Sequence, residues 1–461
     1  MHMTSDVRLQ TRFVYRVFLA LMMLIPAIVV IHASQGAVAQ ESGSVSFAFW
    51  GDPAEEDAYE RVISEFEATQ PDIDVEAQYT ADSGDFQTKV ATSFAAGAPP
   101  DVFLINYRRF GQFAARGALE PLQSYFDASE TLNEADFYQA PMDAFRYRGE
   151  ELVCIPQNVS SLVVYVNVDL FEEYGVPVPY EGWTLDEFVD AAVAMTHDFN
   201  GDGVNEVHGL ALDPSLIRYA PFIWVNGGEI VDDVDNPTTL TLDTAEALEA
   251  IEWFVSLGQT GYRVTPSEAE TLAEDDQSRF MNGRAAMFMQ SRRAVPTLRE
   301  IDGFRWDVVP LPVGEQEANI LHSDAFCMSA QAENKEAAWE FIEFAVGEAG
   351  QTILAETGRT VPSMISVAES DVFLKGTNVG SQIGVGGLAV APANSQVFLD
   401  NIETMRRVPS ISTWPEIEEA FNTPFKRAFY VEIDIPGAIE VAVFFSRDAF
   451  ERALAEEETG G

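Results

Sequence analysis

Short apolar runs alternate with amphipathic segments between residues 45 and 105, and this alternation limits the fold more than any other feature. Residues 45–50, 75–79 and 102–105 have the length and composition of β-strands. Residues 59–69 and 86–96 lie between them and carry apolar side chains at helical spacing. The order β-α-β-α-β predicts an α/β fold built on a mostly parallel sheet flanked by helices.

Polar and aromatic residues follow the ends of two of these strands. Trp50 ends the first strand and Asp52 follows it, and Asn106 and Arg109 come after the third. Ligands in open α/β sheets bind beyond the carboxyl ends of the strands. We therefore expect these four residues to line a binding site.

Length and charge narrow the class of protein further. The chain has 461 residues, too many for one compact core, so two or more lobes are expected. Its 74 acidic residues outnumber 27 basic ones, which gives a formal charge of −47. Such a chain repels nucleic acids and anionic lipid surfaces, which argues against a DNA- or RNA-binding role. The acidity fits a saline habitat, and ordinary drift in composition explains it equally well.

The N-terminus has the three parts of a secretory signal peptide. Arg8, Arg12 and Arg16 precede an apolar run at 17–31, and small residues at 37–39 form an A-x-A motif. The run is short for a membrane span and contains a proline, although an uncleaved anchor is the alternative. We expect cleavage after residue 39, no lipid attachment, and a soluble mature protein in the periplasm or outside the cell.

Several short motifs occur in a fixed order along the rest of the chain. They are APPDVF (98–103), FAARGALEPL (113–122), CIP (154–156), LVVYVNVDLF (162–171), GWTLDEF (182–188), WVNGGEI (224–230), FMNGRAAM (280–287), VVPLP (308–312) and AAWEFI (337–342). In this order the mature chain resembles the extracellular solute-binding proteins of sugar ABC importers, the maltose-binding-protein-like group.

The resemblance implies a type II periplasmic-binding-protein fold with the ligand in a cleft between two α/β lobes. It places residues 42–156 and about 328–395 in the N-terminal lobe, and about 157–327 and 396–461 in the C-terminal lobe. It further implies a monomer that clamps a sugar by hinge closure and delivers it to the membrane subunits of an importer. No enzymatic activity and no cofactor are expected.

Sugar chemistry selects the remaining candidate residues. Sugar C–H faces stack on aromatic rings, and sugar hydroxyls need paired donors and acceptors. The predicted ligand-binding residues are Trp50, Asp52, Asn106, Arg109, Asn158, Ser160, Asp213, Trp224, Asn226, Arg293, Asp324 and Trp414. For each tryptophan the alternative is a packing role, and for each polar residue a role in satisfying loop backbone groups.

Two arginine pairs suggest an anionic ligand. After residues 285–287 the related sugar binders commonly place a glycine and an aromatic residue, whereas this chain has Gln290, Ser291, Arg292 and Arg293. A second pair occurs at residues 108–109. Arginine binds carboxylate and phosphate through parallel hydrogen bonds, so an anionic or phosphorylated sugar is one interpretation. The other is that these arginines neutralise nearby acids.

One loop spaces its oxygen atoms like a calcium-binding loop. The positions are Asp198, Asn200, Asp202, Val204 and Glu206. Glycine stands at the sixth position, but the twelfth is also glycine, where a bidentate glutamate is usual. A structural calcium ion and a plain turn are both compatible with this pattern.

The sequence allows two interpretations of the two cysteines. Cys154 lies just before the expected first crossover, and Cys327 lies in the strand expected to cross back. In an exported protein they can form a disulfide, and free buried thiols are the alternative.

Two other classes of function compete with sugar import. A secreted carbohydrate-active enzyme would need a carboxylate pair, but the many acids of this chain give such pairs no diagnostic weight. The sequence has neither a G-x-S-x-G elbow nor an H-E-x-x-H helix, and no nucleophile has an evident base. A binding protein for iron or a polyamine is the other alternative.

Overall fold

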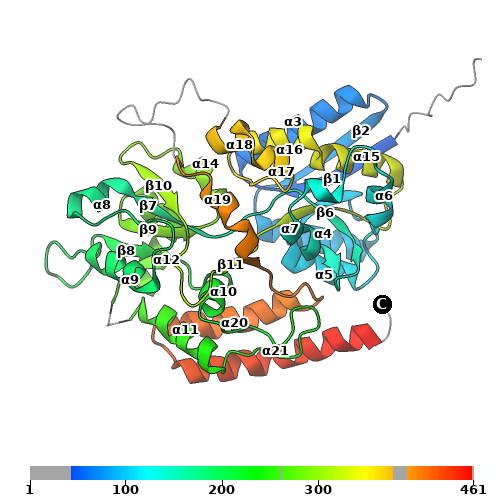
Figure 1. Cartoon of the computed structure of the whole chain (residues 1–461). Helices are drawn as coiled ribbons and strands as arrows, with labels where there is room; N and C mark the ends of the chain where they lie inside the picture. The colour runs from blue at the N-terminus through cyan, green and yellow to red at the C-terminus, as the bar shows by residue number, and fades with distance from the viewer. Residues whose placement is uncertain (1–42, 260–261, 377–391, 459–461) are drawn as a thin grey trace, which may run out of the picture. The chain divides into compact units, whose positions relative to one another are not determined.

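The computed structural model describes residues 43–259, 262–376 and 392–458 (Figure 1). The predicted signal peptide lies outside the described residues. None of the helices in the described part of the chain has both the length and the hydropathy that a membrane span requires.

The first sheet has five strands in the order β2-β1-β3-β12-β6. They are β1 (Gly43–Trp50), β2 (Ile73–Thr80), β3 (Val102–Asn106), β6 (Cys154–Pro156) and β12 (Asp324–Met328). Strands β1 and β3 are parallel, as predicted, whereas β12 runs antiparallel to both β3 and β6. Strands β1, β3 and β6 therefore point the same way, in agreement with the predicted mostly parallel sheet. Strand β12 is reversed because it enters the sheet from a distant part of the chain.

Helices α3 (Pro53–Thr69), α4 (Ser83–Ala96), α15 (Lys335–Val346) and α16 (Glu348–Glu356) accompany this sheet. Helix α3 begins where the Asp52 carboxylate accepts hydrogen bonds from the backbone N–H groups of its first turn. Its buried side chains include Val62, Ile63 and Phe66, which confirms the apolar face predicted from their spacing. These side chains anchor the helix to the core.

The second sheet has four strands in the order β10-β7-β9-β8. They are β7 (Val163–Asn167), β8 (His208–Ala211), β9 (Ala285–Gln290) and β10 (Trp306–Val309). Strands β8 and β9 are parallel, but β7 runs antiparallel to β9 and β10. Strands β8, β9 and β10 therefore share one direction and β7 is reversed, which agrees with the predicted mostly parallel sheet in this lobe.

The second sheet is accompanied by α9 (Leu185–Ala194), α10 (Leu216–Val225), α11 (Ala245–Ser256) and α13 (Asp276–Met281). Thr184 and Glu187 form a capping box at the start of α9.

The C-terminal helices α20 (Trp414–Phe429) and α21 (Ile435–Glu458) pack on each other, and α20 also contacts α5, α10 and α11. The remaining helices and strands are short: β4 (Arg146–Tyr147), β5 (Glu151–Leu152), β11 (Asn319–Ile320), β13 (Met405–Arg406), α5 (Tyr107–Ala114), α6 (Gln123–Ala128), α7 (Gln139–Ala144), α8 (Val168–Tyr174), α12 (Glu268–Ala273), α14 (Val295–Leu298), α17 (Ile365–Ala368), α18 (Asp371–Lys375), α19 (Val397–Asp400) and the 3-10 helices Glu134–Asp136, Arg292–Ala294 and Ile402–Thr404.

Two segments join the sheets, at residues 157–162 and 321–323. They pair as an antiparallel bridge, in which the backbone N–H of Ser160 lies 2.8 Å from the carbonyl of His322 and the reverse bond measures 2.7 Å. All of β12 pairs with strands of the first sheet. Residues 324–327, which the prediction assigned to the C-terminal lobe, therefore belong to the first sheet.

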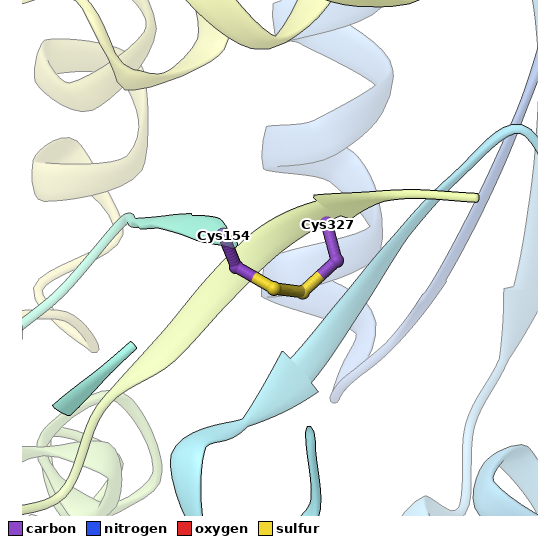
Figure 2. The surroundings of a disulfide bond; sticks show 2 residues. All are labelled: Cys154 and Cys327. Carbon is purple, nitrogen blue, oxygen red and sulfur yellow. A yellow bond between two sulfur atoms is a disulfide. The ribbon is translucent and has the colours of Figure 1, made fainter. Parts of the chain in front are cut away.

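A disulfide bond joins Cys154 in β6 to Cys327 in β12 (Figure 2). The two residues face each other in the register of the antiparallel pair, with Cα atoms 4.5 Å apart. The sequence left open a disulfide or two free buried thiols, and the structure has the disulfide. It closes a segment of the chain that contains all four strands of the second sheet.

Candidate ligand-binding site

A cavity of about 840 Å³ is lined by residues from elements of both sheets. This volume is in the usual range for sites that bind small molecules, about 300–1,000 Å³. Nine of the predicted ligand-binding residues line it: Trp50, Asp52, Asn106, Arg109, Asn158, Ser160, Asp213, Arg293 and Asp324.

The ends of β3 and β12 supply a network of amides around one carboxylate. Because β12 is antiparallel to β3, its first residue, Asp324, lies opposite Asn106, the last residue of β3. The side-chain amide of Asn106 donates to one Asp324 oxygen at 3.0 Å, and that of Asn158 donates to the other at 3.4 Å. The Asn158 carbonyl oxygen accepts the Asp324 backbone N–H at 2.8 Å. These bonds fix the orientation of three side chains at the edge of the first sheet.

Arg359, which follows α16, binds two carboxylates beside the end of β1. Its guanidinium lies 2.6 Å from Asp52 and 2.6 Å from Glu55. Burial raises the pKa of Glu55 to about 7, although the guanidinium of Arg359 opposes this shift. The group therefore combines a buried carboxyl that titrates near neutral pH with a permanently charged partner.

Two aromatic residues line the same part of the cavity. The Trp50 ring packs 4.8 Å from the ring of Phe86 and is half-buried. The Tyr79 hydroxyl donates to the backbone carbonyl of Gly51 at 2.9 Å, which holds its ring beside the end of β1. An exposed aromatic face next to fixed polar groups can stack on an amphipathic ligand.

The second sheet contributes charged residues to the cavity. Arg218 lies in α10, Asp213 follows β8, Asp276 begins α13 and Arg293 follows β9. Arg218 is 3% exposed, and burial lowers its pKa. Arg293, in contrast, is exposed.

The segments that join the sheets also face the cavity. His322 and Ser160, the residues of the antiparallel bridge, both line it. The His322 Nε2 and Ser160 Oγ atoms are buried and have no hydrogen-bond partner among the described residues. Burial lowers the pKa of His322 well below its usual range, and three guanidiniums lower it further. This pKa shift favours the neutral form of the imidazole, and its Nε2 atom is available to a ligand as far as the described residues show.

Three predicted residues do not line the cavity. Trp224 is buried near the end of α10, and the Arg406 guanidinium lies 4.9 Å over its ring. Asn226 ends that helix and donates to the carbonyl of Glu246 at 2.9 Å. Trp414 is fully buried at the start of α20. A neighbouring glycine or helix start, the basis of these predictions, does not fix the direction of a side chain.

The two arginine pairs separate in the structure. Arg108 and Arg109 both line the cavity, and Arg108 pairs with Glu418 of α20. Of the second pair, Arg293 lines the cavity. Arg292 is buried elsewhere, where it donates to the carbonyl of Gly358 at 2.9 Å and stacks on aromatic rings.

Sequence reasoning missed a further set of cavity residues. Those that carry charge or hydrogen-bonding groups are Glu55, Tyr79, Asp82, Ser83, Gln87, Ser215, Arg218, Asp276, Gln277, Gln290, Ser291, Thr297, His322, Arg359 and Thr360. Of these, only Gln290 and Ser291 lie inside a motif that drew attention to the site. The others come from helices and loops whose local patterns carry no signal of a cavity.

The predicted calcium loop forms a turn stabilised by its own side chains. The carboxylate of Asp198 accepts the backbone N–H groups of Gly201 and Gly203, at 2.7 and 2.8 Å, and these bonds hold its pKa below its usual range. The carboxylate of Glu206 accepts the backbone N–H of Phe199. In the described part of the chain, no group of three or more His, Cys, Asp or Glu residues is arranged to hold a metal ion. Calcium binding stays a prediction.

The cavity has the chemistry of a reversible binding site. It presents fixed amides, carboxylates, guanidiniums and a hydroxyl beside an aromatic face, and its lining comes from both sheets. A ligand that touches both halves favours a closed arrangement of the two. Fold and cavity together define a two-lobed solute-binding protein.

The family follows from a match over most of the chain. Residues 50–352 match the model of the bacterial extracellular solute-binding protein family. The chain belongs to this family.

Curated relatives are distant in sequence. A provisionally named binding protein of Brucella abortus is 24% identical over 367 residues, which cover 78% of this chain and 82% of the relative. A maltotriose-binding protein of Pyrococcus abyssi is 23% identical over 314 residues, which cover 66% of this chain and 63% of the relative.

Solved structures share the fold. An ABC substrate-binding protein of Listeria monocytogenes in complex with cycloalternan matches with a TM-score of 0.78 at 24% identity, covering 90% of this chain and 100% of that one. Maltose-bound MalE3 of T. maritima matches with a TM-score of 0.71 at 22% identity, covering 87% and 98%. The predicted type II periplasmic-binding-protein fold is confirmed.

Proposed function

We propose that this protein is the sugar-binding component of an ABC importer, acting in the periplasm or outside the cell as a monomer. The cavity carries this proposal, because it sets an aromatic face beside amides and carboxylates that can pair with hydroxyl groups. Relatives named for maltotriose binding and structures with bound cycloalternan or maltose support a carbohydrate ligand.

The mechanism follows from the placement of the lining residues. The Asn106–Asn158–Asp324 network belongs to the first sheet and its connection, whereas Arg218 and Arg293 come from the second. A sugar bound to both sets stabilises a closed form, which would present a composite surface to the importer's membrane subunits. The segments at 157–162 and 321–323 would act as the hinge between the two lobes.

A thermal-shift screen tests the function. Neutral mono- and oligosaccharides, uronates, sugar phosphates, polyamines and ferric iron are added separately to the mature protein. A true ligand at 100 times its Kd stabilises the folded state by about 2.7 kcal/mol and raises the melting temperature. We expect a carbohydrate to do this and to be recovered unchanged after incubation. Stabilisation by iron or a polyamine alone, or conversion of the sugar to product, would contradict the proposal.

A further inference from the structure

Three arginines in the cavity lack partners of their own. Among the described residues, neither a hydrogen bond nor an ion pair involves the guanidinium of Arg109, Arg218 or Arg293. The other two cavity arginines differ: Arg108 pairs with Glu418, and Arg359 pairs with Asp52 and Glu55. The chain has 74 acidic residues, so three guanidiniums without a carboxylate in one cavity are not explained by a shortage of partners.

Arg218 is the most constrained of the three. It is 97% buried, since its exposed fraction is 3%, and its Nε and Nη1 atoms have no hydrogen-bond partner among the described residues. A buried polar group without a partner is unfavourable, and a buried charge is more so. Asp213 and Asp276 act on it electrostatically, but neither lies within the 4.0 Å of an ion pair.

Arg218 and Arg293 share surroundings with His322. Both guanidiniums act electrostatically on the His322 imidazole, as does Arg108, and Arg293 also acts on Arg218. The Nε2 atom of His322 is itself buried without a partner among the described residues. Positive charge and free hydrogen-bonding groups therefore converge on one part of the cavity.

The carboxylates of the cavity are mostly committed elsewhere. Asp52 and Glu55 bind Arg359, and Asp324 accepts from two side-chain amides. Asp82 accepts two backbone N–H groups at the start of α4. Asp213 and Asp276 are the remaining carboxylates of the lining, and among the described residues neither forms an ion pair with Arg109, Arg218 or Arg293.

We propose that the solute carries a carboxylate or phosphate group that binds Arg218 and Arg293 beside His322. The proposal rests on the proposed function and adds the class of sugar: an acidic one, a uronate or a sugar phosphate. Its anionic oxygens accept hydrogen bonds from the two guanidiniums. The planar, charged guanidinium of arginine suits this pairing with a carboxylate or phosphate. The hydroxylated remainder meets the amide network and Trp50 at the edge of the first sheet.

Matched sugars test the charge requirement. Isothermal titration compares glucose, glucuronate and glucose 6-phosphate, and the corresponding galactose and mannose sets, each at two salt concentrations. In at least one set we expect an acidic member to bind about tenfold or more tighter than the neutral sugar, because hydrogen bonds to charged groups are the stronger ones. Its affinity should fall as salt rises. Comparison of the uronate titrations with the sugar phosphate titrations shows whether the site prefers a carboxylate or a phosphate group.

Variants test the residues. Arg293→Gln, at an exposed position, and Arg218→Gln should each weaken the acidic sugar at least about tenfold more than they weaken the neutral sugar, because only the acidic sugar loses a charge-assisted hydrogen bond. Arg452→Gln, on the surface of α21 and outside the cavity, is the matched control and should change neither affinity. If Arg218→Gln does not fold, the Arg293 variant decides alone.

The two proposals fail in different ways. A neutral sugar that binds as well as its acidic partners, with Arg293→Gln unchanged, overturns the anion site and leaves sugar binding intact. The same holds if the variant weakens neutral and acidic sugars equally. If no sugar of any set binds, both proposals fall together.

Discussion

Loss of the Cys154–Cys327 disulfide should destabilise the protein strongly while leaving its binding site intact. The bond closes a loop with a sequence separation of 173 residues. In the loop-entropy description, losing a cross-link that closes a loop of this length lowers the free energy of unfolding by about 5 kcal/mol at 25 °C. Most of that effect acts on the unfolded chain, because the reduced chain can explore many more conformations.

The measurement is equilibrium urea unfolding of the oxidised protein and of protein unfolded and refolded in a thiol reductant, so that both samples keep the same side chains. Oxidised protein should unfold at the higher urea concentration, and the affinity for ligand should be equal in the two samples. Cys154→Ala with Cys327→Ala is the control and should no longer respond to reductant. Equal unfolding midpoints would refute the entropy argument, and a loss of affinity on reduction would show that the bond shapes the folded state instead.

Three further predictions concern single groups. Burial raises the pKa of Glu55 from 4.5 to about 7, so the folded state binds the extra proton and its stability falls as pH rises from 4.5 to 7. Glu55→Gln should therefore gain about 3 kcal/mol relative to wild type between pH 5 and pH 8 in urea unfolding, and a difference independent of pH would contradict this. If the loop at Asp198 holds calcium, EDTA should lower the melting temperature and added calcium restore it; an unchanged melting temperature would dismiss the site. Trp50→Ala should weaken sugar binding by about 1 kcal/mol or more, measured by titration, whereas Trp339→Ala, outside the cavity, should leave affinity unchanged.

The order of elements was predictable because it depends on local patterns. The apolar spacing in α3 acts within a few residues, and it is confirmed. The start of α21 is harder to predict, because Pro436 and Gly437 resemble a break, although proline is tolerated in the first turn of a helix. The antiparallel direction of β12 was not predicted either, because it depends on how the chain returns from the second sheet.

The cavity was predictable only where it adjoins strand ends. Asp52 and Asn106 were found because they follow the carboxyl ends of parallel strands. Asp324 was chosen only as a polar residue that suits a sugar, and the structure places it at the same edge because it begins β12, which is antiparallel to β3. Arg218 and Arg359 were missed because a helix and a loop bring them in from positions far along the chain. The evidence for these two residues is structural: Arg218 is buried without a hydrogen-bond partner for two of its nitrogen atoms among the described residues, and Arg359 forms two ion pairs. The amino-acid sequence contains no information on either property.

The bridge between Ser160 and His322 joins the two connecting segments by a pair of reciprocal backbone hydrogen bonds. Two strands bonded in this way bend together as a narrow ribbon, which resists shearing in its own plane and yields most easily perpendicular to it. If these segments form the proposed hinge, such a ribbon would restrict rotation of one lobe against the other mainly to one axis. Because His322 also lines the cavity, a ligand that pairs with its imidazole would act directly on this hinge.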